Sequence, residues 1–185
     1  MNTTALKQLA ELLSKRNELG AEIARLIGRP AFDGHIAEFV GSEIFGIDLH
    51  SSAANRGFDG RFRDGQLAGK SVNIKWRGKN DGTLNLSPTV PPPDFYLVFA
   101  GATSSPGSSR GDDRPWLVDA AYLFDAPALV RALSSRGIKV GTACAVSTEF
   151  WRDAEVFPVN RSKHVQLDKA TREILRWFAS AEQGV

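Results

Sequence analysis

The chain reads RGFDG at residues 56–60 and SVNIKW at residues 71–76, and its fold can be worked out from these two segments. If the second segment is a strand, its side chains point alternately to opposite faces of a sheet. Asn73 and Lys75 then share one polar face, and the apolar side chains share the face turned to a core. Glycines between the two segments indicate a hairpin-like path, which would bring Asp59 close to Asn73 and Lys75.

A helix is predicted before these segments, over residues 34–46, with Asp33 as its N-cap and Gly46 as its end. Its apolar stripe consists of Ile36, Ala37, Val40 and Ile44. Glu38 lies off that stripe, beside a glycine and a phenylalanine at i+3 and i+7. Taken alone, Glu38 is an ordinary surface residue. Combined with Asp59 and Lys75 downstream, it becomes a candidate site residue.

An acid on a helix, then Gly-Phe-Asp-Gly, then a strand ending in polar-Ile-Lys resembles the PD-(D/E)XK nuclease superfamily, which has the restriction-endonuclease-like fold. In that family the Asp and the next acidic position bind a divalent metal, and the Lys serves the attacking water. Asp59 takes the first position, Asn73 the second and Lys75 the third, and Glu38 matches the helix carboxylate that many members add. The match covers roughly residues 31 to 100. Asn73 departs from the family, which usually has Glu or Asp there, or sometimes Gln.

The resemblance implies an α/β fold, with a restriction-endonuclease-like core of mixed β-sheet flanked by helices and extra helices at both ends. It also implies Mg²⁺ or Mn²⁺ as cofactor and hydrolysis of phosphodiester bonds, in DNA above all. Asp59 and the Asn73 amide oxygen would hold the metal together with the Ile74 carbonyl, because Mg²⁺ prefers oxygen ligands. Glu38 could restore the charge that Asn73 lacks. Lys75 would orient the water or help to deprotonate it.

Charge is distributed unevenly along the chain. The net charge is only +2, yet residues 55–81 hold seven basic and three acidic side chains, a net +4, and the remainder carries −2. Phosphate binding requires such a concentration around a site, although a solvated hairpin could also show it. The basic residues predicted to contact nucleic acid are Arg56, Arg61, Lys70, Arg77 and Lys79.

Composition places further limits on the protein. The 185 residues, 42% of them hydrophobic and 24% charged, suit one domain with a sizeable core. The single cysteine, Cys144, cannot form an internal disulfide, so the cytoplasm is the expected compartment. No signal peptide and no membrane span are expected, because the apolar runs are short or interrupted by charge.

The chain divides into an N-terminal amphipathic helix in residues 1–30 and a single nuclease-like domain in residues 31–185. The helix, over residues 3–28, is expected to dock on or next to the core, and it could instead pair with a second copy to give a homodimer. Later elements are predicted from local patterns. They are a buried strand at 95–99, a mobile or substrate-covering loop at 103–113, a strand at 115–118, a helix from Asp125 to Gly137, a strand at 138–146, and helices at 148–154 and near the C-terminus.

Two other interpretations stay open on the sequence alone. In the first, the fold is that of the nucleases but Asn73 marks a decayed metal site, so that the protein binds nucleic acid or assembles with a partner. In the second, the protein is an unrelated α/β domain, and Asp59 and Lys75 form an ordinary salt bridge.

Overall fold

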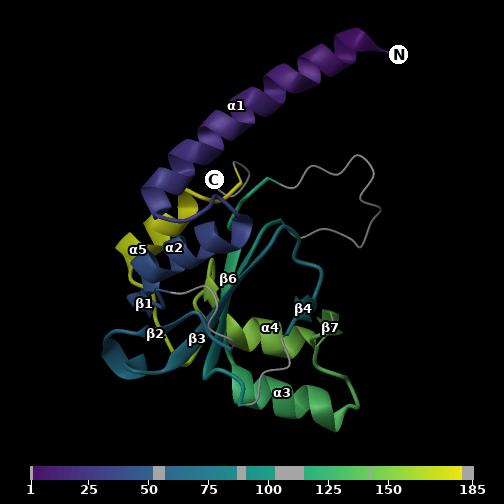
Figure 1. Ribbon diagram of the computed structural model, residues 1–185. Helices are drawn as coiled ribbons and strands as arrows, with labels where there is room; N and C mark the ends of the chain where they lie inside the picture. The colour runs from purple at the N-terminus through teal and green to yellow at the C-terminus, as the bar shows by residue number, and fades with distance from the viewer. Residues whose placement is uncertain (1, 52–56, 87–90, 103–114, 142, 181–185) are drawn as a thin grey trace.

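The computed structural model describes residues 2–51, 57–86, 91–102, 115–141 and 143–180 (Figure 1). The fold is mixed α/β, as predicted: a central mixed sheet carries helices on both faces. The helices are α1 (Thr3–Ile27), α2 (Asp33–Phe45), α3 (Ala126–Ser135), α4 (Thr148–Ala154) and α5 (Lys169–Arg176), with a short 3-10 turn at Gly65–Leu67. In the described part of the chain, no helix is long and apolar enough to cross a membrane.

The central sheet has six strands in the order β1-β2-β3-β5-β6-β8. Their bounds are β1 (Ile47–Leu49), β2 (Gly60–Phe62), β3 (Ser71–Arg77), β5 (Phe95–Ala100), β6 (Ala120–Asp125) and β8 (Glu155–Phe157). Strands β3 and β5 are parallel, and the other neighbours are antiparallel. A separate two-stranded sheet pairs β4 (Thr83–Asn85) with β7 (Ala143–Ala145).

Two apolar clusters hold the layers together, one on each face of the central sheet. The first joins Val72 and Ile74 of β3 to α2 and α5. The second lies under α3, α4 and the small β4–β7 sheet, and includes Tyr96 of β5. Strand β5 is buried at every residue, as its continuous apolar run predicts for a strand covered on both faces.

Helix α2 packs closely on the sheet because Gly41 faces it. A β-carbon added at Gly41 would lie 3.1 Å from Ile74 Cδ1 and 3.3 Å from Leu97 Cδ2, tighter than ordinary van der Waals contact. The helix ends at Gly46, which adopts the left-handed conformation expected of a C-cap (φ 61°). Its N-terminus differs from the prediction: the capping position is Phe32, and Asp33 is the first helical residue.

Helix α1 confirms the periodicity prediction in its extent but not its expected docking. None of its described residues is buried, and most of the helix projects away from the core (Figure 1). Leu19 and Leu26 are 60% and 75% exposed. The short loop that follows α1 carries Arg29 back to the core, where it contacts Glu38 of α2.

Two predicted strands were wrong in position. Residues 115–118 form no strand, and the chain enters the sheet later, as β6. In the described part of residues 138–146, only Ala143–Ala145 forms a strand, β7, which pairs with β4 outside the main sheet. The helix predicted from Asp125 to Gly137 is present at Ala126–Ser135, with Asp125 as its cap, which accepts a hydrogen bond from Ala128 N at 2.8 Å. The helix predicted at 148–154 is confirmed. The predicted loop at 103–113 lies outside the described residues.

Candidate active site

Asp59 stands where β2 and β3 stop pairing. Its backbone N–H donates to the Val72 carbonyl at 2.8 Å, and its own carbonyl accepts from His50 N at 2.9 Å. The paired register of β2 and β3 begins at the next residue, Gly60, opposite Val72. A β-carbon at Gly60 would lie 2.5 Å from the Asp48 carbonyl oxygen, so only glycine fits there. The glycine after Asp59 therefore lets β1 approach β2 directly beside the carboxylate.

The Asp59 carboxylate takes the place of a strand partner for β3. Ile74 N donates to Asp59 Oδ2 at 2.6 Å. In a strand, the N–H and C=O of one residue leave on the same side, so the Ile74 carbonyl is also directed toward the Asp59 side of β3. Burial raises the pKa of Asp59, whereas the Ile74 hydrogen bond and the charge of Lys75 lower it, and the net shift is upward.

Lys75 lies within electrostatic range of Asp59 from the neighbouring strand. Burial lowers the pKa of its ammonium group, and the Asp59 charge opposes that shift only in part. The Nζ atom also lies 5.8 Å from the centroid of the Tyr96 ring, at the outer range of a cation–π contact. Lys75 is thus a half-buried cation whose charged partner in this site is Asp59.

Asn73 lies two residues before Lys75 on β3, so both side chains extend from the same side of the strand. Its Oδ1 atom is buried and, within the described residues, accepts no hydrogen bond. Leaving a buried amide oxygen unpaired carries a desolvation cost. A cation or a water bound at this point would remove that cost.

Glu38 of α2 lies within electrostatic range of Asp59. Burial raises the pKa of its carboxyl group, and the nearby charge of Asp59 raises it further, while Arg29 and His35 lower it. The fold holds the two carboxylates within electrostatic range of each other, so their negative charges repel. Both carboxyl groups therefore bind protons more readily than ordinary surface acids do.

Arg29 is a candidate site residue that the sequence patterns did not predict. Its Nη1 atom donates to Glu38 Oε2, and its Nη2 atom donates to the His50 carbonyl at 2.6 Å. The guanidinium thus joins α2 to the segment after β1 and places a positive charge beside the two carboxylates. Local patterns give no signal for this role, because Arg29 lies in the turn after α1 and meets its partners only in three dimensions.

A divalent cation suits the chemistry of these groups in part. Asp59 and Glu38 supply carboxylate oxygens, and Asn73 Oδ1 and the Ile74 carbonyl supply neutral ones; hard cations such as Mg²⁺ take oxygen ligands of these kinds. The unpaired Asn73 oxygen is the observation that favours this fit. Among the described residues, however, no group of three or more His, Cys, Asp or Glu side chains is arranged to hold a metal.

The predicted phosphate-binding residues fall into different environments. Arg56 lies outside the described residues, and Lys79 is half-buried just after β3. Arg61 is exposed, donates to the Gly69 carbonyl at 2.7 Å and lies 4.8 Å over the Phe58 ring. Lys70 is exposed and forms a 3.4 Å ion pair with Asp94, a weak type of contact that phosphate could replace.

Arg77 differs from this expectation because its guanidinium is used inside the protein. Its Nη2 atom donates to Asp81 Oδ1 and to Thr83 Oγ1, each at 2.8 Å. Its side chain is only 16% exposed. Arg77 therefore holds the turn between β3 and β4 in place and is poorly disposed to bind a phosphate.

If the protein binds duplex DNA as the resemblance implies, Arg61→Ala and Lys70→Ala should weaken that binding and reduce its salt dependence. Removing one cation that neutralises a phosphate should change the log–log slope of affinity against salt by about 0.9. Arg77→Ala should instead lower the melting temperature, because it breaks a hydrogen-bonded turn. The matched control is Arg152→Ala, on the exposed surface of α4. If the slopes of Arg61→Ala and Arg152→Ala are equal, the assignment of Arg61 is wrong.

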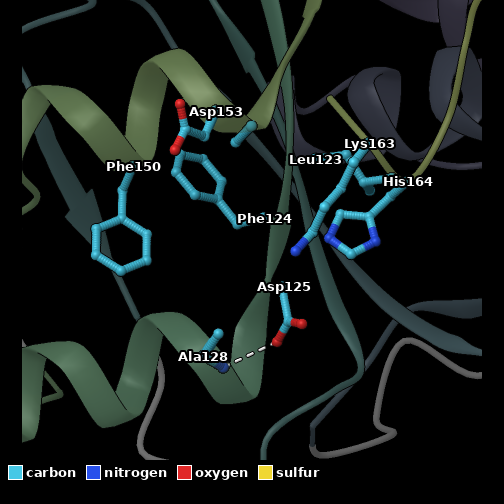
Figure 2. A pocket seen from close by; sticks show the side chains of 9 residues that line it. Leu123, Phe124, Asp125, Ala128, Phe150, Asp153, Lys163 and His164 are labelled. Atoms are coloured by element: carbon cyan, nitrogen blue, oxygen red, sulfur yellow. Dashed lines mark hydrogen bonds between the residues drawn. The ribbon is translucent and has the colours of Figure 1, made fainter. Parts of the chain in front are cut away.

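A separate hollow of about 160 Å³ lies between β6, α3 and α4 (Figure 2). Phe124, Phe150 and His164 contribute to its wall, and the Asp125 carboxylate at its edge is already used to cap α3. Burial lowers the pKa of His164, and the charge of Lys163 lowers it further. None of the predicted site residues that the structure describes lines this hollow.

No protein-family model matches the chain, and no curated protein matches it either.

Proposed function

We propose that the protein is a metal-dependent nuclease that hydrolyses phosphodiester bonds, with DNA as the foremost substrate. The observation that carries the proposal is the coupling of Asp59 with Lys75 across β2 and β3, beside the Glu38 carboxylate of α2. In an ordinary surface salt bridge both side chains stay exposed, whereas Asp59 and Lys75 are both half-buried. Buried, mutually perturbed acids and bases gather at functional sites more often than elsewhere.

The arrangement of the elements supports a restriction-endonuclease-like core. Helix α2 packs against β3, the antiparallel β1–β2–β3 segment carries Asp59 and Lys75, and β5 lies buried beside β3. The resemblance implies a buried strand after the lysine strand, and β5 has that character. The proposed core therefore consists of α2 and the strands from β1 to β5.

In this proposal Asp59, Asn73 and the Ile74 carbonyl hold Mg²⁺ or Mn²⁺. When bound, such an ion neutralises charge on the phosphate and makes water a better nucleophile. Asp59 supplies the negative charge for the ion, and the hydrogen bond from Ile74 N fixes the direction of its carboxylate. Glu38 adds a second negative charge, and Arg29 limits the repulsion between the two carboxylates.

Lys75 acts on the attacking water in this scheme. Its ammonium group, partly withdrawn from solvent, can donate a hydrogen bond that orients the water and can offset the negative charge that develops on the phosphate. Because burial lowers its pKa, Lys75 also gives up a proton more easily than an exposed lysine does. Both effects require the ammonium group to stay close to Asp59.

Two observations favour a second candidate, a nuclease-fold protein without activity that binds nucleic acid or a partner. The residue at the second metal position is the neutral Asn73, and the Glu38 carboxylate is already paired with Arg29. Both features reduce the negative charge available to a cation. The candidates are separated by incubating the purified protein with labelled duplex DNA, branched DNA and RNA in Mg²⁺ and in Mn²⁺. Cleavage in any arm supports the nuclease, and binding without cleavage supports the alternative.

We expect Asn73→Asp to tighten metal binding, because it adds a full negative charge where the parent offers only an amide oxygen. If the parent is active, the variant should cleave at least as fast and at a lower metal concentration; if the parent is inactive, the variant should bind Mn²⁺ detectably for the first time. The measurement is Mn²⁺ titration by calorimetry together with the cleavage assay. Asn85→Asp, at an exposed position in β4, makes the same change away from the site. Equal Mn²⁺ affinities for the two variants would contradict the metal assignment.

A further inference from the structure

One face of α1 is apolar, and over most of its length no described part of the chain covers it. The helix has 25 residues, which corresponds to a rod about 37 Å long. Seven large apolar side chains are exposed along it: Leu6, Leu9, Leu12, Leu13, Leu19, Ile23 and Leu26. An apolar surface of this extent on a projecting helix marks an interaction site.

The apolar residues of α1 follow a heptad pattern over more than three repeats, with one charged residue, Arg16, at a core position. Positions a are Leu9, Arg16 and Ile23, and positions d are Ala5, Leu12, Leu19 and Leu26. Positions e are also apolar or small: Leu6, Leu13, Gly20 and Ile27. Sustained a and d periodicity at this length is typical of a helix that pairs with another helix as a coiled coil.

We propose that the occupant of this face is α1 of a second copy of the chain, paired in the antiparallel direction. The charges at positions g select this partner and this direction. With the a and d residues aligned so that Leu12 faces Ile23 of the partner copy, Lys15 lies opposite the partner's Glu22. The two-fold symmetry of the pair repeats this contact, so two Lys–Glu ion pairs flank the apolar seam.

Side-chain size favours the same arrangement. On the other flank of the seam, Leu13 lies opposite the partner's Gly20, and a β-carbon at Gly20 would meet no atom within 4 Å in the single chain. A glycine inside a helix is otherwise unfavourable, and here it leaves room for the leucine. In a parallel pair, by contrast, Lys15 would face Gly20 and Glu22 would face Ile27, so no ion pair would form.

The first test is the oligomeric state of the full chain by sedimentation equilibrium. We expect a concentration-dependent dimer, and Leu19→Glu should raise the dissociation constant of this dimer by at least roughly a hundredfold. The fold of the core should survive, because α1 has no buried residue; the melting temperature of the core checks this. Ala21→Glu adds the same charge at position f, on the opposite face, and should leave the dimer intact. A parent protein that stays monomeric at all concentrations overturns the proposal, and so does a dimer that Leu19→Glu leaves unchanged.

The second test addresses the direction of the helices. Lys15→Glu should weaken the dimer by roughly tenfold, because it turns two attractive pairs into repulsive ones. The double variant Lys15→Glu with Glu22→Lys should restore it, and Lys7→Glu, at position f, should have no effect. A mixture of Leu12→Cys and Ile23→Cys chains should form an oxidative crosslink that neither chain forms alone. Crosslinking of Leu12→Cys chains to themselves would mean a parallel pair and would contradict the proposed direction.

This inference is independent of the proposed nuclease activity, since it depends on α1 alone. A dimer without cleavage would support the helix pairing and leave the nuclease proposal to its own assay. Cleavage by a monomer would do the reverse.

Discussion

Asp59→Ala is expected to abolish metal-dependent cleavage, with a loss of roughly a thousandfold or more. Metal ions contribute several kcal/mol to the stabilisation of such transition states, and each ~1.4 kcal/mol corresponds to a tenfold change in rate. Asp59 is the principal negatively charged ligand in the proposed site, and its carboxylate also fixes the Ile74 amide. The measurement is the initial rate on labelled duplex DNA across a Mg²⁺ and Mn²⁺ titration.

A second variant separates chemistry from folding in this experiment. Asp59→Asn keeps the shape of the side chain and an oxygen that can accept from Ile74 N, but it removes the charge. It should retain the parent's melting temperature more nearly than Asp59→Ala does and should lose activity just as fully at moderate metal concentration. Asp153→Ala, on the exposed surface of α4, is the matched control. Cleavage that survives Asp59→Ala would point to another site or to a contaminant, and the proposed nuclease would fail.

Lys75→Met is expected to reduce the cleavage rate by about a hundredfold to ten-thousandfold, the usual contribution of a positioned acid or base. Methionine retains most of the apolar stem beside Tyr96 and removes the ammonium group. Metal binding should persist or strengthen, because the variant has no positive charge near Asp59 at this position. The measurements are the single-turnover cleavage rate and the Mn²⁺ affinity of the same preparation.

The pH dependence gives Lys75 a signature that a structural role would not produce. Its pKa lies below the ordinary lysine value of 10.5 in the folded protein, so its deprotonation should change the cleavage rate at a lower pH than that of an exposed lysine. This alkaline change should disappear in Lys75→Arg, because arginine stays protonated. Lys169→Met, at an exposed position of α5, should leave both the rate and its pH profile unchanged. A parent-like rate in Lys75→Met would remove Lys75 from the proposed mechanism.

The proposed site also illustrates how a cluster of charges can be held together. Glu38 and Asp59 each have a raised pKa, and Lys75 has a lowered one, with burial as the largest cause in all three cases. Burial thus favours the neutral form of each group. The hydrogen bond from Ile74 N and nearby opposite charges, among them those of Arg29 and Lys75, oppose it in part. Perturbed pKa values of this kind gather at functional sites more often than elsewhere.

Several features of this protein follow from local sequence alone. The extent of α1 and the C-terminal end of α2 agree with the apolar periodicity and with Gly28 and Gly46. Helix formation and termination depend on neighbouring residues and on the left-handed conformation that glycine accepts. The face shared by Asn73 and Lys75 follows from alternation, since β3 is long enough to show it. The continuous apolar run of β5 leaves neither face polar, so it predicts burial on both faces.

Other features arise only when distant segments meet. Strands β1, β2 and β8 have three residues each, too few for a periodic pattern, and they exist because a neighbouring strand supplies their hydrogen bonds. Arg29 donates to Glu38 and to the His50 carbonyl, which lie in later segments of the chain. Arg77 donates to Asp81 in the turn that follows β3 instead of facing solvent. Periodicity marked one face of α1 as apolar, but whether the core covers it depends on where the chain turns after Gly28. That turn directs the helix outward. A local pattern can specify which face of a helix is apolar, but only the packed chain decides what that face contacts.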